Sequence, residues 1–183
     1  MELLFVLLLA LAIDALLGEP PRAIHPVVWI GKVTSFWERF APVRGVRSQL
    51  VYGGGMTLLT IFIFTMPVYL LLFYANQVGT LVYIIVGALL LKPALSFKEL
   101  RRVAIDVKLL LTKNNIEEAR AKMLALVSRE TRSLGKPALV SAAVESVAEN
   151  VSDSFVAPLF YFLCFGVLGA VAYRVVNTLD AMI

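Results

Sequence analysis

Three acidic side chains repeat at helical spacing in the last quarter of the sequence. Glu145, Glu149 and Asp153 stand at positions i, i+4 and i+8, so an α-helix would place them in one stripe. Stacked carboxylates repel one another unless a cation neutralises their charge. Carboxylate oxygens are hard ligands, which suit Mg²⁺ bound together with phosphate. A solvated acidic face is the alternative. We favour the metal site because the stripe leads directly into an uncharged apolar run, residues 154–173.

Other candidate groups lie earlier in the chain. Asp14 ends an apolar run, and an ionisable residue at the end of a membrane helix is a functional candidate, with an interfacial carboxylate in water as the alternative. His25 is the single histidine and offers a base, although a lone histidine is more often structural. Arg129, in the cluster Ser-Arg-Glu-Thr at 128–131, offers a guanidinium suited to phosphate. A surface ion pair is the alternative for that cluster.

The elements that position these groups are predicted to be membrane helices. Of the 183 residues, 60% are hydrophobic and 16% charged, and the mean hydropathy is +0.84. Soluble domains are less apolar and more charged. Residues 51–91 contain no charged side chain, which is enough for two spans of about 20 residues with a turn at 76–79. The first apolar run lacks the basic start of a signal peptide, so we expect a retained helix.

The sequence thus predicts an all-α, polytopic helical membrane protein in the cell membrane. The spans are expected near 3–17, 54–75, 80–96 and 154–173, with a helical insert over about 97–153. Basic residues number five in 18–50 and eleven in 92–153, and the turn at 76–79 has none. The positive-inside rule places both basic segments in the cytoplasm and that turn outside. Basic and aromatic residues are not interleaved, so no nucleic-acid partner is expected.

Within the insert, two helices are predicted. Asn114 would cap a helix that runs to about 127 and has one apolar face, comprising Ile116, Ala119, Met123 and Leu126. Gly135 and Pro137 would begin the second helix. Its apolar stripe comprises Val140, Val144, Val147 and Val151.

The motifs resemble those of the adenosylcobinamide-phosphate synthase family of cobalamin (vitamin B12) biosynthesis, the membrane proteins called CbiB or CobD. Six stretches carry the resemblance in the family's order and cover nearly the whole chain. They are Asp14-Ala-Leu-Leu-Gly18-Glu19-Pro20, His25-Pro26-Val27 with Ile30-Gly31, Ser128-Arg129-Glu130-Thr131, Glu145-Ser-Val-Ala-Glu149-Asn150, Asp153 with Ala157-Pro158-Leu159-Phe160-Tyr161, and Tyr173-Arg174 with Asn177-Thr178-Leu179-Asp180. Glu130 and Ser154 depart from the usual Asp and Gly. The chain ends inside the last motif, so we expect an N-terminal portion of a longer protein.

The resemblance implies an ATP-dependent ligase that joins adenosylcobyric acid to aminopropanol phosphate through an amide bond. It also implies Mg²⁺ and ATP, corrinoid and aminopropanol phosphate substrates, a lipid bilayer, and other membrane proteins of the pathway as partners. A non-catalytic membrane sensor of the same superfamily is the alternative, and a transporter comes third. The candidate catalytic residues are Asp14, His25 and Glu130. The candidate substrate-binding residues are Glu19, Arg129, Asn150, Arg174, Asn177 and Asp180, and the candidate metal ligands are Glu145, Glu149 and Asp153.

On chemical grounds, the acidic stripe with Mg²⁺ would hold the triphosphate, and Arg129 or Arg174 the second phosphate. His25 or Asp14 would take the proton from the amine. A straight span over 154–173 would put Arg174 a bilayer away from the stripe. Pro158, Gly166 and Gly169 allow a broken helix where protein buries the backbone. We therefore predict that this segment bends back, or packs at a depth that brings Asn177 and Asp180 toward Glu149 and Asp14.

Overall fold

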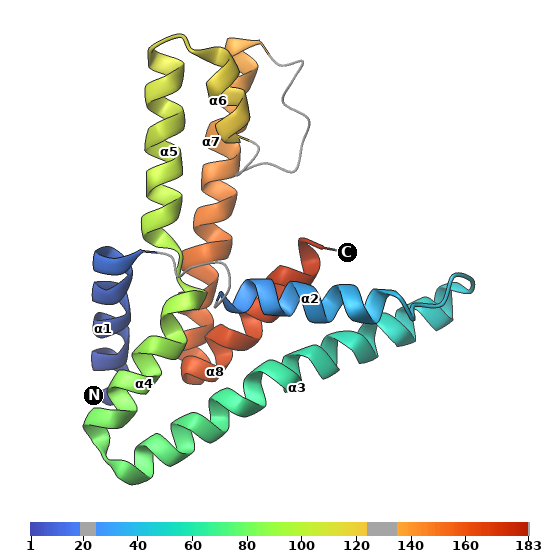
Figure 1. Ribbon diagram of the computed structural model, residues 1–183, viewed down its shortest axis with the longest axis vertical. Helices are drawn as coiled ribbons and strands as arrows, with labels where there is room; N and C mark the ends of the chain where they lie inside the picture. Colours follow the sequence, from blue (N-terminus) through green and yellow to red (C-terminus); the bar gives the residue numbers. More distant parts are fainter. Residues whose placement is uncertain (19–24, 124–134, 183) are drawn as a thin grey trace.

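All regular secondary structure in the described residues is helical, which confirms the all-α class (Figure 1). The computed structural model describes residues 1–18, 25–123 and 135–182. The elements in chain order are α1 (Glu2–Leu17), α2 (Pro26–Glu38), α3 (Val46–Val78), α4 (Thr80–Leu91), the short 3₁₀ helix η2 (Lys92–Ala94), α5 (Phe97–Thr112), α6 (Ile116–Met123), α7 (Lys136–Val151), the π-helical turn η3 (Ser152–Val156) and α8 (Ala157–Asp180).

The structure supports a membrane protein. Within the described residues, three helical stretches are long and apolar enough to cross a bilayer: Val46–Val78, Thr80–Thr112 and Lys136–Asp180. On α3, large apolar side chains such as Leu58 and Phe62 leave more than half of their surface exposed. An apolar surface of this extent is stable when lipid covers it.

The helix boundaries differ from the predicted spans in physically informative ways. Helix α3 begins at Val46 rather than near 54, and it continues through the three glycines at 53–55 and through Pro67. The predicted turn at 76–79 is reduced to Gly79, whose φ of 151° suits glycine, because residues 76–78 stay helical. Helix α4 has 12 residues. At 1.5 Å per residue this is about 18 Å, too short to cross a bilayer core alone.

Helix α8 reverses direction at Gly166, as predicted for the segment 154–173. Gly166 has φ 67° and ψ −158°, a conformation open almost only to glycine. The rings of Tyr161 and Tyr173 stack with their centroids 5.0 Å apart, whereas a straight helix would separate positions twelve residues apart by about 18 Å. A Cβ on Gly169 would clash with the Tyr161 carbonyl, so the two arms are in close contact. The end of α8 therefore turns back instead of continuing across (Figure 1).

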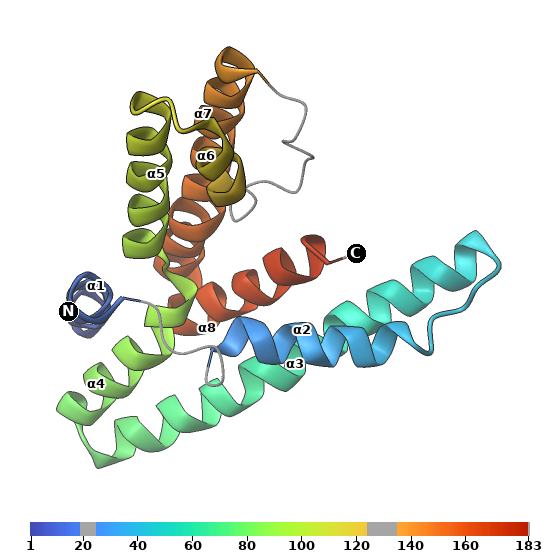
Figure 2. The ribbon, with the colours of Figure 1, turned by 45° about the horizontal axis from the view of Figure 1, so that its top comes forward.

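The helices pack around separate apolar cores. The largest core joins α1, α3, α4 and α8 through Val6, Leu72, Leu91 and Phe162. Helices α5, α6 and α7 have a core of their own and stand apart from α2 and α3 in both views (Figure 2). A further core joins α2, α3 and the end of α8.

Two details of the predicted insert need correction. Asn114 does not begin α6. It has a left-handed φ of 60° beyond the end of α5, and its side chain accepts a hydrogen bond from Lys136 Nζ at 2.9 Å. The valine stripe is not the buried face of α7, since Val144 is 66% exposed while Leu139 is fully buried. Ala119 and Met123 are buried, as predicted for α6, and Lys136 begins α7 one residue before Pro137.

Candidate functional site

Asp14 joins the end of α1 to the beginning of α5. Its side chain is buried, and its Oδ2 accepts a hydrogen bond from the backbone N–H of Lys98 at 3.0 Å. Its Oδ1 lies 3.7 Å from Nζ of Lys92, which is also buried. A carboxylate at a helix N-terminus is favoured by the helix dipole, and an ion pair in this setting is screened little by water.

Asp14 performs the capping that the residue before α5 does not. Ser96 occupies the N-cap position, but its side chain makes no capping hydrogen bond. An N-cap side chain normally accepts from the second or third N–H of the helix, and Lys98 is the second residue of α5. In return, Lys98 Nζ donates to the Leu16 carbonyl at 2.9 Å, in the last turn of α1. The predicted catalytic Asp14 thus has a structural role that is visible in its contacts.

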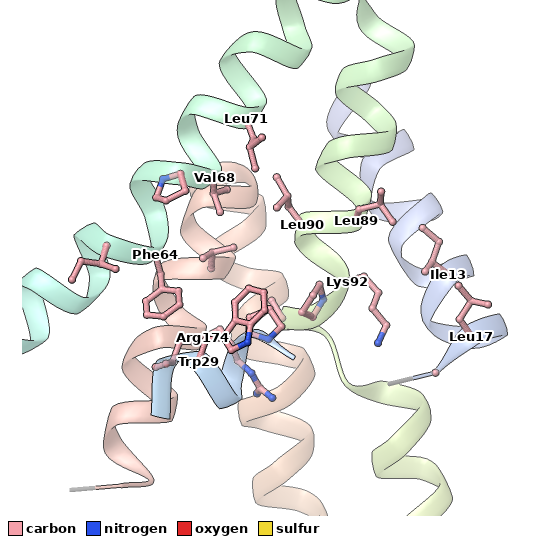
Figure 3. Close-up of a pocket in the computed structure, with 18 residues that line it drawn as sticks. Ile13, Leu17, Trp29, Phe64, Val68, Leu71, Leu89, Leu90, Lys92 and Arg174 are labelled. Carbon is pink, nitrogen blue, oxygen red and sulfur yellow. The ribbon is translucent and has the colours of Figure 1, made fainter. Parts of the chain in front are cut away.

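Lys92 and Arg174 line one cavity of about 800 Å³, although they lie in helices far apart in the sequence. The remaining lining is almost entirely apolar and comes from α1, α2, α3, α4, η2 and α8. Figure 3 shows Arg174 beside Trp29 and Lys92 farther toward α1, both toward the end of the cavity away from Val68 and Leu71. The reversal of α8 at Gly166 carries Arg174 to this position.

His25 is the N-cap residue of α2. Its Nδ1 accepts a hydrogen bond from the Val27 backbone N–H at 3.3 Å, and Pro26 occupies the first helical position. Pro26 also lines the cavity, so His25 is adjacent in sequence to the cavity wall. The imidazole is half-buried and holds the start of α2 in place.

The acidic stripe is divided between two kinds of helix. Glu145 and Glu149 are exposed on α7, whereas Asp153 lies in the π turn η3, where Ala157 N–H bonds the Ser152 carbonyl. The prediction assumed a continuous α-helix, whereas the helix widens to a π turn at Ser152–Val156, where Asp153 lies. Asp153 lies near the Tyr173 side chain on the returning arm of α8. Among the described residues, no three acidic, histidine or cysteine side chains form a group that could hold a metal ion.

The first turn of α5 connects the two acidic segments. The Ser96 N–H donates to the Ser154 carbonyl in η3 at 3.2 Å, two residues before the Lys98 N–H that binds Asp14. The rings of Phe97 and Phe155 also lie 5.3 Å apart. Segments around Asp14 and around residues 153–155, far apart in the chain, therefore meet at one helix end.

The other predicted residues are placed as follows. The Asn150 side chain donates to the Ser146 carbonyl of its own helix at 2.8 Å. Arg174 Nη1 contacts Asn177 Oδ1 at 3.5 Å, and Asp180 is exposed at the end of α8. Glu19, Arg129 and Glu130 lie outside the described residues.

Sequence reasoning did not identify Lys92, Lys98 or Trp29 as parts of this region. A signal existed for Lys92, because it is the first charged residue after the uncharged run 51–91. An ionisable group in that position is a functional candidate on the same grounds as Asp14. Lys98 acts mainly through its backbone N–H, which every residue type except proline supplies, so its role leaves no trace in the sequence.

Comparison with known proteins agrees with the motifs. A family model described as "CobD/Cbib protein" matches residues 7–183. A "Cobalamin biosynthesis protein CobD" of Dehalococcoides mccartyi is 50% identical over 183 residues, covering 100% of this chain and 59% of the relative. A "Probable cobalamin biosynthesis protein CobD" of Thermococcus kodakarensis is 44% identical over 187 residues, covering 100% of this chain and 60% of the relative. One of Methanothermobacter thermautotrophicus is 40% identical over 178 residues, with 97% and 57% covered.

No solved structure matches the chain. The chain spans about three fifths of the length of these curated relatives. The family model covers nearly all of this chain, and the relative that is 50% identical aligns with the whole length of this chain. This confirms the resemblance drawn from the motifs: the chain belongs to the CobD/CbiB family.

Proposed function

We propose that this chain is part of a cobalamin-biosynthesis enzyme that joins adenosylcobyric acid to aminopropanol phosphate in an ATP-dependent amide ligation. Family membership and the names of the relatives support the pathway. The observation that carries the proposal further is the junction at the first turn of α5. There the segments of Asp14 and Asp153 meet, and Asp153 lies near Tyr173 on the returning arm that bears Arg174.

Such a ligation sets three tasks for the protein. A carboxylate must be activated at the expense of ATP, a phosphorylated amine must be held beside it, and the ammonium must lose a proton before it attacks. Mg²⁺ keeps several waters and is usually held by one or two carboxylates together with substrate phosphates. Two exposed glutamates on α7 and a half-buried Asp153 fit that limited requirement, even though they do not form a complete cage. When bound, Mg²⁺ would neutralise phosphate charge.

We assign the remaining roles by what each side chain already contacts. Both carboxylate oxygens of Asp14 face partners in α5 and η2, so we assign Asp14 to positioning and leave proton transfer to His25 or Glu130. Arg174 lines an apolar cavity, a poor place for a small soluble phosphate. We therefore favour Arg129 for the phosphate of the amine. Both basic segments, 18–50 and 92–153, are proposed to be cytoplasmic, where ATP is present.

Complementation with the full-length gene tests the proposal. Cells lacking their own synthase should form adenosylcobinamide phosphate when they express the wild-type gene. The variants Glu149→Gln and Asp153→Asn should lose this product while the protein remains inserted in the membrane. The matched control is Glu118→Gln, which removes an exposed carboxylate from α6 and should leave output unchanged. Normal product formation by Glu149→Gln and Asp153→Asn would contradict the proposed role of these residues in metal binding. Absence of product with the wild-type gene would contradict the proposed reaction.

A further inference from the structure

The cavity lined by Lys92 and Arg174 combines a large apolar volume with a cationic end. Its volume of about 800 Å³ lies in the range of sites for small molecules and cofactors. Apart from the two cations, its wall offers few polar groups to a ligand. The lining therefore suits an occupant that is mostly apolar and carries an anionic group at one end.

The cavity also has partly exposed apolar side chains at its rim. It lies between α3 and α4, which belong to stretches long and apolar enough to cross a membrane. Leu71 and Leu89 line it and are 53% and 55% exposed, so they form part of its rim. An acyl chain can reach the lining from the lipid phase between these side chains.

The two ends of the cavity match the two ends of a phospholipid. In Figure 3, Lys92 and Arg174 lie on the side from which α5 departs, and Leu71 lies on the side of the α3–α4 turn. Helix α5 begins the polar insert, so the cationic end faces the polar part of the protein. A guanidinium binds phosphate oxygens in a fixed planar geometry, and a buried ammonium adds a compact positive charge.

Two other occupants fit less well. A free phosphate would engage the cations and leave the apolar volume empty. A corrinoid carries amide groups around its ring, and burial of an amide without a hydrogen-bond partner is unfavourable. The apolar wall of this cavity offers few such partners.

We propose that this cavity binds one anionic membrane phospholipid, with its phosphate at Lys92 and Arg174 and an acyl chain along the apolar wall. This site is separate from the acidic stripe of the ligation, and its test does not depend on catalytic activity. Through Lys92, which also pairs with Asp14, the lipid would contact the residue that joins α1 to α5.

The test uses the full-length protein purified in mild detergent and native mass spectrometry. Phosphatidylglycerol and phosphatidylcholine with identical chains are titrated separately. Phosphatidylglycerol should bind about tenfold more tightly, which corresponds to ~1.4 kcal/mol. Arg174→Gln should abolish this preference and Arg174→Lys should retain part of it. The matched control Arg101→Gln, an exposed arginine on α5, should leave the preference unchanged.

A second pair of variants tests the apolar half of the site. Leu89→Trp adds bulk at the rim of the cavity, and Leu81→Trp adds the same bulk to an exposed position on α4 outside it. Only Leu89→Trp should weaken binding of both lipids. Retention of the lipid preference in Arg174→Gln, or equal binding of the two lipids to wild type, would overturn the proposal. Displacement of phosphatidylglycerol by inorganic phosphate would also overturn it, in favour of a soluble anion. Failure of the full-length protein to bind either lipid would overturn it as well.

Discussion

Replacement of Asp14 by alanine should be among the most destabilising single changes in the membrane core. The substitution removes the acceptor of the Lys98 N–H at the start of α5, and loss of an N-cap acceptor typically costs about 1 kcal/mol. It also leaves Lys92 buried without its carboxylate, and removal of one partner of a buried ion pair costs about 3–5 kcal/mol. These side chains are only 7% and 3% exposed, so solvent screening does not reduce the estimate. Because the two losses share one carboxylate they do not add, and we expect a total of about 3–5 kcal/mol.

Reversible unfolding in mixed micelles, followed by circular dichroism, measures this free energy. The matched control is Asp106→Ala, which breaks an ion pair with Lys122 at 2.9 Å whose side chains are 36% and 48% exposed. Exposed pairs contribute about 1 kcal/mol or less, so this control should change stability little. Asp14→Asn should fall between wild type and Asp14→Ala, because the amide oxygen can still accept from Lys98.

A double-mutant cycle isolates the ion pair. Lys92→Met removes the ammonium but keeps an unbranched apolar side chain of similar length. Combined with Asp14→Ala, it should be less destabilising than the sum of the two single changes by about 1–3 kcal/mol, as is typical for groups in contact. The structural role assigned to Asp14 is refuted if Asp14→Ala costs no more than Asp106→Ala, or if the cycle gives additive values.

Three further predictions concern the bend, the histidine and the topology. Gly166→Ala should destabilise the protein by about 1–3 kcal/mol in the same unfolding assay, because its φ of 67° is strained for alanine. The control Gly54→Ala, where a Cβ meets open space in α3, should be neutral or stabilising. His25→Asn should keep the stability of α2, because asparagine caps helices well, but lose product formation in the complementation assay if His25 transfers the proton. Wild-type output would exclude that role. In a Cys164→Ser background, a cysteine at Gln77 should react with an impermeant thiol reagent from outside and one at Lys108 should not; the reverse pattern would invert the orientation.

Composition and the placement of charges were sufficient to predict the class and most of the helices. The uncharged run 51–91 predicted a helical hairpin because about 20 apolar residues cross a bilayer. The limits of that reasoning appear at Gly79 and Leu91. Polar Asn76 and Gln77 suggested a wider turn, but they remain in α3. Helix α4 ends at Leu91, although the span was predicted to continue to about residue 96. Hydropathy describes the preferred solvent of a segment and does not determine where its backbone hydrogen bonds stop.

The candidate site was less predictable because its contacts join distant parts of the chain. The Asp14 carboxylate and the Lys98 N–H are separated by 84 positions, and no local pattern relates them. The π turn at Asp153 also has no sequence periodicity of its own, so the i, i+4, i+8 spacing was extended through it as if the helix were regular. The bend at Gly166 was predictable for a different reason. A straight span would have separated Arg174 from the acidic stripe, and glycine supplied a position where the backbone could turn.

The bend and the π turn have complementary effects on the same stretch of helix. Helix α7 passes through η3 into α8 without a loop, so a regular straight helix would carry the chain steadily away from the polar insert. The reversal at Gly166 returns the chain, and the stacked rings of Tyr161 and Tyr173 mark where the two arms meet. Asp153, in the π turn, lies near the same Tyr173. Arg174 follows directly and lines the cavity that Lys92 also lines, and Lys92 pairs with Asp14. The acidic segment, the cationic cavity and the first turn of α5 are thereby brought close together, and straightening at Gly166 would separate them without changing any charged residue.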